Sequence, residues 1–105
     1  VIGGKSREFE NNFPLHLGKR YGILTNSGSS ANLVMVHAFT SKQKFMKKYH
    51  LPKGSKIITP VVCFPTTINP IIQAGFEPVF VDVDLPSLNL NLDEVERLMR
   101  DSGLV

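Results

Sequence analysis

The pattern of apolar and polar positions predicts a helix near the start of the chain. Apolar residues recur at every fourth position between Lys5 and Leu17, which is the spacing of one helical face. Gly18 follows as a stop signal. Pro14 lies inside this stretch, so we expect the helix to break or kink near Phe13.

A strand, a turn and a long helix are predicted next. Tyr21–Thr25 is β-like and runs into a polar turn at Asn26–Ser30. From Ser30 to about Tyr49 the residues favour one long helix, which is almost wholly apolar over Leu33–Phe39 and basic later. We expect its first half to pack against a sheet and its second half to reach solvent.

The second half of the chain continues this alternation. Lys56–Thr59 predicts a short strand, and Pro78–Val83 has the β-branched, apolar pattern of a strand that is buried on both faces. Leu92–Arg100 predicts a last helix, for which Asn91 or Asp93 can act as the N-terminal cap.

A further helix is predicted between those two strands. Pro65 suits the first turn of a helix that runs to about Ala74, and Gly75 suits its end. Pro70 lies in the interior of this helix and is expected to weaken or kink it. Strands that alternate with helices predict the α/β class, with a parallel-type sheet flanked by helices.

The composition is that of a folded protein of at most one small domain. The chain has 105 residues, of which 42% are hydrophobic and 20% charged, so it is not of the disordered class. The net charge is +3, and four lysines cluster in the second half of the long predicted helix: Lys42, Lys44, Lys47 and Lys48. A nucleic-acid patch and a solvated helix end both fit these lysines; without a basic aromatic face, we expect no nucleic-acid partner.

The single cysteine and the absence of long apolar runs bear on the cellular location of the protein. Cys63 alone cannot build a disulfide framework or a metal cluster, which fits a reducing, cytoplasmic location. No apolar run approaches the length of a membrane span, so we expect no membrane partner. The chain lacks an initiating Met and stops just after a predicted helix, which suggests a piece of something longer.

The turn after the first predicted strand has the character of a phosphate-binding site. A strand, a Gly/Ser turn and a helix N-terminus present backbone N–H groups and a partial positive charge to an anion. Gly28 lets the backbone approach an anion closely, and Ser29 and Ser30 can add hydroxyl donors. An ordinary capped junction between a strand and a helix is the alternative.

Three polar or unusual segments follow predicted strands: Asn26–Ser30, Pro60–Thr67 and Asp82–Asp84. The carboxyl ends of parallel strands share one edge of a sheet, so these segments should converge there. Phe64 is either a flat face for a planar ring or a residue that caps the core.

Several other residues keep two interpretations. Thr66 and Thr67 fit helix caps or ligand contacts. Asp82 and Asp84 could bind a metal or act as a base, although a strand-end pair that caps the next turn is commoner. Cys63 lacks a neighbouring base in sequence, so a buried or rim thiol is favoured over a nucleophile.

Four short motifs occur together and in order. They are Asn26–Leu33 (NSGSSANL), Lys53–Pro60 (KGSKIITP), Phe64–Pro70 (FPTTINP) and Pro78–Asp84 (PVFVDVD). With this order and spacing, essentially the whole chain resembles the large domain of the DegT/DnrJ/EryC1/StrS family of sugar aminotransferases and dehydratases. Members of this family are fold-type-I enzymes that depend on pyridoxal or pyridoxamine 5'-phosphate.

The resemblance implies roles for four residues. Gly28, Ser29 and Ser30 match the turn that holds the cofactor phosphate, and Phe64 matches an aromatic that stacks on the pyridine ring. Asp82 and Asp84 belong to a strand that mainly shapes the fold. Residues 1–105 would be the N-terminal part of the cofactor-binding domain, with no catalytic residue and no metal ligand. The chain alone would then be inactive, because the Schiff-base position and the aspartate that pairs with the pyridine nitrogen lie further along.

Within the family, the chain is most similar to the 3-dehydratase branch, such as the CDP-4-keto-6-deoxyglucose 3-dehydratases of lipopolysaccharide biosynthesis. The branch acts on nucleotide-linked 4-keto-6-deoxyhexoses and has histidine in place of the Schiff-base lysine. A homodimer and a reductase partner would be expected, and an iron–sulfur cluster could come only from cysteines elsewhere. A sugar aminotransferase of the same family and a truncated, non-catalytic product are the alternatives.

Overall fold

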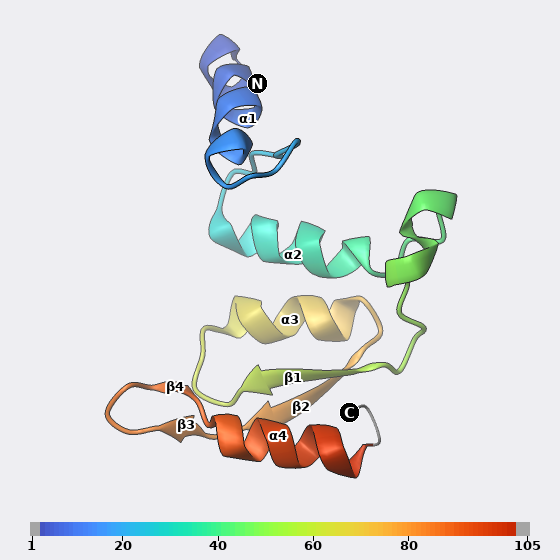
Figure 1. The fold of residues 1–105 in the computed structure, drawn as a ribbon, viewed down its shortest axis with the longest axis vertical. Coiled ribbons are helices and arrows are strands. Elements are labelled where there is room, and N and C mark those ends of the chain that lie inside the picture. Colours follow the sequence, from blue (N-terminus) through green and yellow to red (C-terminus); the bar gives the residue numbers. More distant parts are fainter. Residues whose placement is uncertain (1–2, 103–105) are drawn as a thin grey trace. The chain divides into compact units, whose positions relative to one another are not determined.

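The structure is a computed structural model and describes residues 3–102 (Figure 1). By its internal contacts the chain divides into two compact units, Val1–Ala31 and Asn32–Val105, which are described in turn. Helix α2, Gly28–Ala38, begins in the first unit and continues into the second.

Helix α1, Gly4–His16, forms most of the first unit. The helix continues for two residues beyond Pro14, so the break expected near Phe13 is wrong. Pro14 lies in the last turn, where its missing N–H removes only one helical hydrogen bond. Gly18 ends the helix as predicted: it has a φ of +64° and donates its N–H to the Leu15 carbonyl at 3.0 Å.

The strand predicted at Tyr21–Thr25 is wrong, because this segment is irregular in the structure. The Leu24 N–H donates to Glu10 Oε1 at 2.8 Å, so a side chain takes the place of a strand neighbour. Gly22 packs closely on α1, since an added Cβ would lie 2.5 Å from Pro14 Cγ. Contacts to α1 therefore hold this segment within the first unit.

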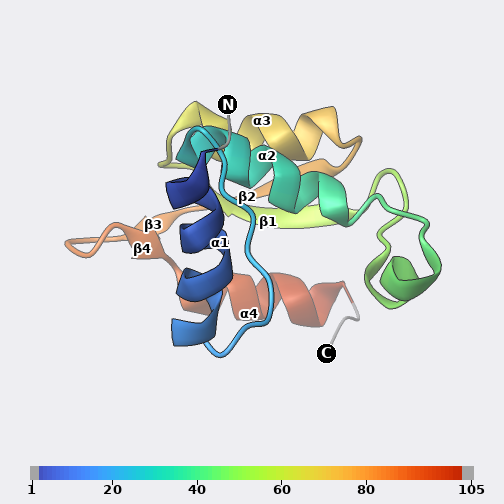
Figure 2. The ribbon, with the colours of Figure 1, turned by 90° about the horizontal axis from the view of Figure 1, so that it is seen from above.

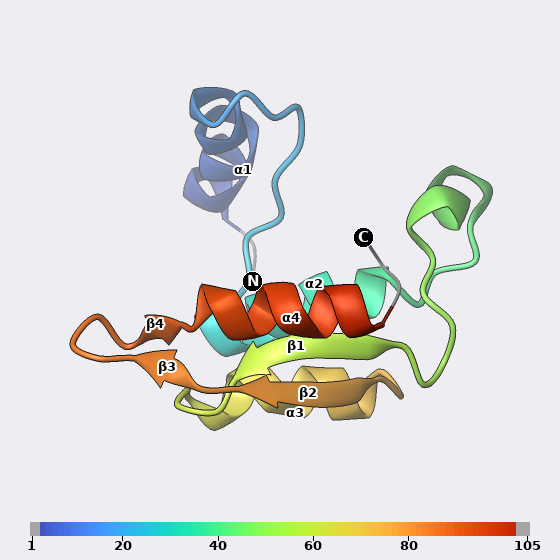
Figure 3. The ribbon, with the colours of Figure 1, turned by 60° about the horizontal axis from the view of Figure 1, so that its bottom comes forward.

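A two-stranded parallel sheet lies at the centre of the second unit. Strands β1, Lys56–Pro60, and β2, Glu77–Val81, pair from Lys56 opposite Glu77 to Pro60 opposite Val81. Helix α3, Pro65–Gln73, connects the two strands and covers one face, and α4, Leu92–Asp101, covers the other (Figure 3). The predicted α/β class with a parallel sheet and flanking helices is confirmed.

The core of the second unit lies around α3. Ile71, Ala74 and Phe76 form a buried cluster, against which pack three half-buried residues: Val36, Leu51 and Ile57. Val36 belongs to α2, which runs alongside α3 in both Figure 1 and Figure 2. The first half of the long predicted helix therefore contacts the core through Val36 and runs alongside α3, so the expected packing against a sheet is wrong.

The single long helix predicted from Ser30 to Tyr49 is wrong, because α2 ends at Ala38. Thr40 Oγ1 donates to the His37 carbonyl at 2.8 Å. The three N–H groups after Ala38, those of residues 39–41, donate to carbonyls three residues earlier, which tightens and ends the helix. The lysine-rich segment forms a separate 3₁₀ helix, η1, Lys44–Tyr49. The bond of the Thr40 hydroxyl to the preceding turn thus accompanies the end of α2 and the start of a separate helix.

The last predicted strand is shorter and less buried than expected. A small antiparallel hairpin of β3, Val83–Asp84, and β4, Asn89–Leu90, follows β2. Val81 is 1% exposed, but the neighbouring Phe80 is 48% exposed. The strand is therefore buried on one face only, and the expected burial of both faces is wrong. Among residues 3–102, no helix has the length and apolarity needed to cross a membrane.

Candidate functional site

The first turn of α2 is organised by Ser27. Ser27 Oγ accepts the Ser30 N–H at 3.1 Å, and the Ser27 carbonyl accepts the Ala31 N–H at 3.0 Å. Ser27 is therefore the N-terminal cap of the helix. Thr25 Oγ1 donates to the Ser27 carbonyl at 2.8 Å and fixes the entry of the chain into the helix.

The predicted phosphate-binding residues occupy the first three positions of this helix. Gly28 and Ser29 are exposed and Ser30 is half-buried. An added Cβ on Gly28 would meet no protein atom within 4 Å, so packing inside the chain does not require glycine there. Ser27 Oγ donates to Ser30 Oγ at 3.2 Å, which leaves the Ser30 hydroxyl hydrogen able to donate outward. The turn thus offers an open backbone and a hydroxyl at the positive end of a helix dipole.

Phe64 stands at the start of α3, in the second unit. Its backbone is extended, with φ −71° and ψ 141°, and Pro65 takes the first helical position as predicted. The Thr67 N–H donates to the Phe64 carbonyl at 2.9 Å. The side chain of Phe64 is 72% exposed, so it does not cap the core. A ring held by its backbone and open to solvent can stack on a planar ligand.

Helix α3 runs on for three residues beyond Pro70, which is buried. Pro70 has no N–H to donate to the Thr66 carbonyl, one turn earlier. That carbonyl accepts a hydrogen bond from Asn32 Nδ2 at 3.5 Å, the long end of hydrogen-bond distance. The Asn32 side chain of α2 therefore bonds to a carbonyl of α3 to which Pro70 cannot donate.

The two aspartates, Asp82 directly after β2 and Asp84 in β3, serve the backbone and a helix cap. Asp82 Oδ1 accepts the Val83 N–H at 2.8 Å, and Asp84 Oδ1 accepts Asn91 Nδ2 at 2.8 Å. Asn91 in turn caps α4, since its Oδ1 accepts the Glu94 N–H at 2.8 Å. Of the two interpretations, these contacts fit the strand-end pair that supports the next turn.

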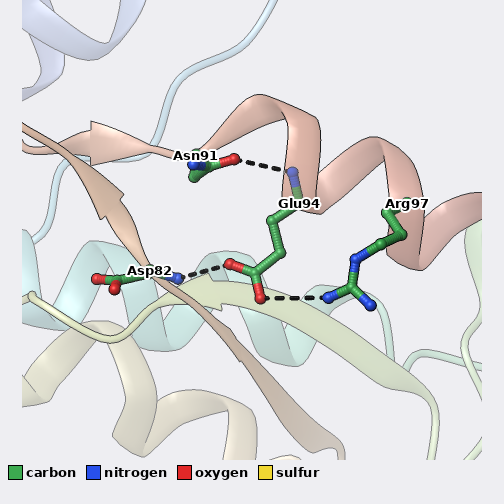
Figure 4. Close-up of polar contacts among 4 residues, drawn as sticks. All are labelled: Asp82, Asn91, Glu94 and Arg97. Carbon is green, nitrogen blue, oxygen red and sulfur yellow. Dashed lines mark hydrogen bonds and ion pairs between the residues drawn. The ribbon is translucent and has the colours of Figure 1, made fainter.

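Glu94 joins α4 to the end of β2 (Figure 4). Its Oε2 accepts the Asp82 N–H at 3.1 Å, and its Oε1 lies 3.6 Å from Arg97 Nη2. The Asn91 N–H donates to the Asp82 carbonyl at 3.0 Å, so both polar backbone groups of Asp82 are bound by α4 or its cap. This carboxylate was not singled out by the sequence pattern.

Two of the three segments expected to converge do start from one edge of the sheet. The Val61 N–H donates to the Val81 carbonyl at 2.9 Å, so the chain leaves β1 and β2 side by side there. The third segment, Asn26–Ser30, follows an irregular stretch and belongs mostly to the first turn of α2. Its predicted position at the end of a strand is therefore wrong.

Cys63 and a metal site are the candidates that remain. Cys63 is a free, half-buried thiol. Within residues 3–102, no group of three His, Cys, Asp or Glu side chains is placed to hold a metal ion. Ser27, Asn32 and Glu94 are the structural contributors that the sequence pattern missed. A serine directly before an apolar helix is the signal that would have found Ser27.

Known proteins resemble the chain over nearly its whole length. It is 45% identical over 96 residues to a dTDP-4-dehydro-2,6-dideoxy-D-glucose 3-dehydratase of Saccharopolyspora spinosa, covering 91% of this chain and 20% of that protein. It is 36% identical over 102 residues to a GDP-4-keto-6-deoxy-D-mannose 3-dehydratase of Escherichia coli O55:H7, covering 97% of this chain and 25% of that protein. The chain thus spans about a quarter or less of these relatives.

A solved structure has the same fold. The E. coli GDP-4-keto-6-deoxy-D-mannose 3-dehydratase with bound hydrated pyridoxal phosphate superposes with a TM-score of 0.80 at 33% identity, covering 92% of this chain and 24% of that one. The fold expected from the motifs, part of a pyridoxal-phosphate-dependent transferase domain, is confirmed. The model of the DegT/DnrJ/EryC1/StrS aminotransferase family matches residues 1–102, and the chain belongs to this family.

Proposed function

We propose that the chain is the N-terminal part of the large domain of a nucleotide-sugar 3-dehydratase and that it holds pyridoxamine or pyridoxal 5'-phosphate. Gly28, Ser29 and Ser30 would bind the phosphate, and Phe64 would stack on the ring. The open space at Gly28 fits this group, because a Cβ there would point into room that the protein does not use. The helix N-terminus adds the partial positive charge that a phosphate requires.

When bound, the cofactor supplies the electron sink for removal of the 3-hydroxyl from a 4-keto sugar. The residues of this chain bind and orient. Backbone N–H groups and serine hydroxyls at the start of α2 fix the phosphate, and the exposed face of Phe64 limits the tilt of the ring. Fixing the reacting group in this way contributes to rate through orientation alone. Proton transfer would be carried out by residues elsewhere in the full-length protein.

The 45% identity to a sugar 3-dehydratase is the observation that carries the choice of reaction. A nucleotide-linked 4-keto-6-deoxyhexose is the substrate class that this assignment implies. We further propose a cytoplasmic homodimer that works with a reductase partner. The aminotransferase alternative predicts a lysine at the Schiff-base position of the full-length protein, whereas the dehydratase predicts a histidine there. Sequencing beyond Val105 separates the two.

The phosphate site is tested by changing Ser29→Ala and Ser30→Ala together in the full-length protein. Losing two hydroxyl contacts to a phosphate should weaken pyridoxamine phosphate binding about 10- to 100-fold. Ser87→Ala, in the hairpin between β3 and β4, is the matched control and should bind normally. Affinity is measured by titration followed by absorbance. If the double variant binds as tightly as the parent, the assignment of this turn is wrong.

A further inference from the structure

Asn32 and Thr66 connect two helices that would each carry part of the proposed cofactor site. Asn32 lies in α2, one turn after Gly28, and its side chain is half-buried. Its Nδ2 donates to the Thr66 carbonyl in the first turn of α3 at 3.5 Å. The bond lies wholly within the second unit of the chain.

Pro70 makes this connection specific. In a continuous helix the N–H of residue 70 would point to the Thr66 carbonyl, but proline has none. The Asn32 amide of α2 donates to the same carbonyl, so a bond between helices reaches an oxygen to which residue 70 cannot donate. An asparagine and a proline far apart in sequence thus act on one backbone oxygen.

Phe64 depends on this part of α3 for its position. Its ring is 72% exposed, so packing of the ring gives little restraint. Its carbonyl accepts the Thr67 N–H at 2.9 Å, which ties it to the first turn of α3. A tether on the Thr66 carbonyl therefore restrains the backbone two residues after Phe64 relative to α2.

We propose that Asn32 is a positioning residue: its bond to the Thr66 carbonyl holds the start of α3, and with it Phe64, to the part of α2 that belongs to the second unit. The role rests on the proposed function, since it concerns the backbone that carries the ring-stacking residue Phe64. Asn32 itself does not touch the cofactor in this proposal.

The test uses the full-length protein and pyridoxal phosphate as the probe. Asn32→Asp keeps the size of the side chain but removes the amide donor, and should lower affinity about three- to tenfold. The absorbance and circular dichroism bands of the bound cofactor should shift, because the ring is less well oriented. Asn32→Gln keeps an amide donor and should restore part of both. Asn69→Ala, on the exposed surface of α3, is the matched control. An Asn32→Asp protein with parental affinity and spectrum overturns the proposal.

A second measurement does not depend on the cofactor. Pro70→Ala gives residue 70 an N–H for the Thr66 carbonyl. The loss of stability caused by Asn32→Asp, measured by denaturant unfolding, should therefore be smaller in the Pro70→Ala background. An equal loss in both backgrounds shows that Asn32 does not act on this carbonyl and also overturns the proposal. If the parent protein binds no pyridoxal phosphate, the proposed function fails, while this cycle still decides whether the tether exists.

Discussion

Phe64 is a large aromatic residue in a place where packing does not explain it. Its side chain is 72% exposed, so replacing it should change the free energy of unfolding by no more than about 0.5 kcal/mol. If the ring stacks on a cofactor, Phe64→Ala should weaken binding by about 0.5–1.5 kcal/mol, since aromatic pairs contribute about that much. Titration of the full-length protein with pyridoxal phosphate measures the affinity.

Phe45 provides the control for that substitution. It is also a highly exposed phenylalanine, at 78%, but it lies in η1 and has no part in the proposed site. Phe45→Ala should leave cofactor affinity unchanged. Equal effects of the two substitutions, or none from either, would contradict the stacking role of Phe64.

Single residues were predictable from sequence where their own chemistry is unusual. Pro65 at the first turn of α3 and Gly18 at the end of α1 follow directly from their backbone preferences. The contact of Asn32 was not predictable, because its partner is the Thr66 carbonyl, 34 positions further along the chain. Sequence spacing carries no signal for such a pair.

At the scale of elements, one carboxylate of α4 bonds directly to the backbone at the end of β2. Glu94 accepts the Asp82 N–H at 3.1 Å and its side chain is 33% exposed. Glu94→Ala should reduce the free energy of unfolding by about 0.5–1.5 kcal/mol, since the Asp82 N–H at the end of β2 loses its carboxylate acceptor and bonds to water instead. Denaturant unfolding of the full-length protein measures the change.

Glu96 is the matched control on the same helix. It pairs with Arg100, but its side chain is 60% exposed, and exposed pairs within one helix contribute only about 0.3–0.5 kcal/mol. Glu96→Ala should therefore cost clearly less than Glu94→Ala. The reverse order would show that the bond to the strand end contributes little.

Elements were predicted well where local signals and packing agree, and poorly where they do not. The β1–α3–β2 unit has a proline start, a glycine end and two apolar strands that pair, and it forms as expected. Tyr21–Thr25 has a strand composition, but the Leu24 N–H bonds to a side chain of α1. A β-like composition becomes a strand only when a partner offers its backbone. The helix predicted through Thr40 failed because that hydroxyl bonds to the preceding turn.

At the scale of the molecule, the described residues build a small core. The buried apolar core of the described residues consists of Ile71, Ala74, Phe76 and Val81, beside the buried prolines of α1 and α3. Within residues 3–102, β1 and β2 pair only with each other, so each leaves one edge open. Two-stranded sheets are marginal on their own, and open edges favour association. These features are those of a part of a larger domain, in keeping with the quarter of each relative that the chain covers.

The isolated 105-residue chain should therefore behave differently from the full-length protein. We expect it to unfold without a sharp transition, to bind a dye for exposed apolar surface and to show no turnover with pyridoxamine phosphate and a 4-keto-6-deoxyhexose nucleotide. The physical reason for the loose folding is that Phe80, 48% exposed on β2, has too little apolar surface to pack against within this chain. The full-length protein, under identical conditions, should unfold cooperatively. A sharp, cooperative transition together with turnover by the isolated chain would show that the core and the catalytic groups are already complete within it.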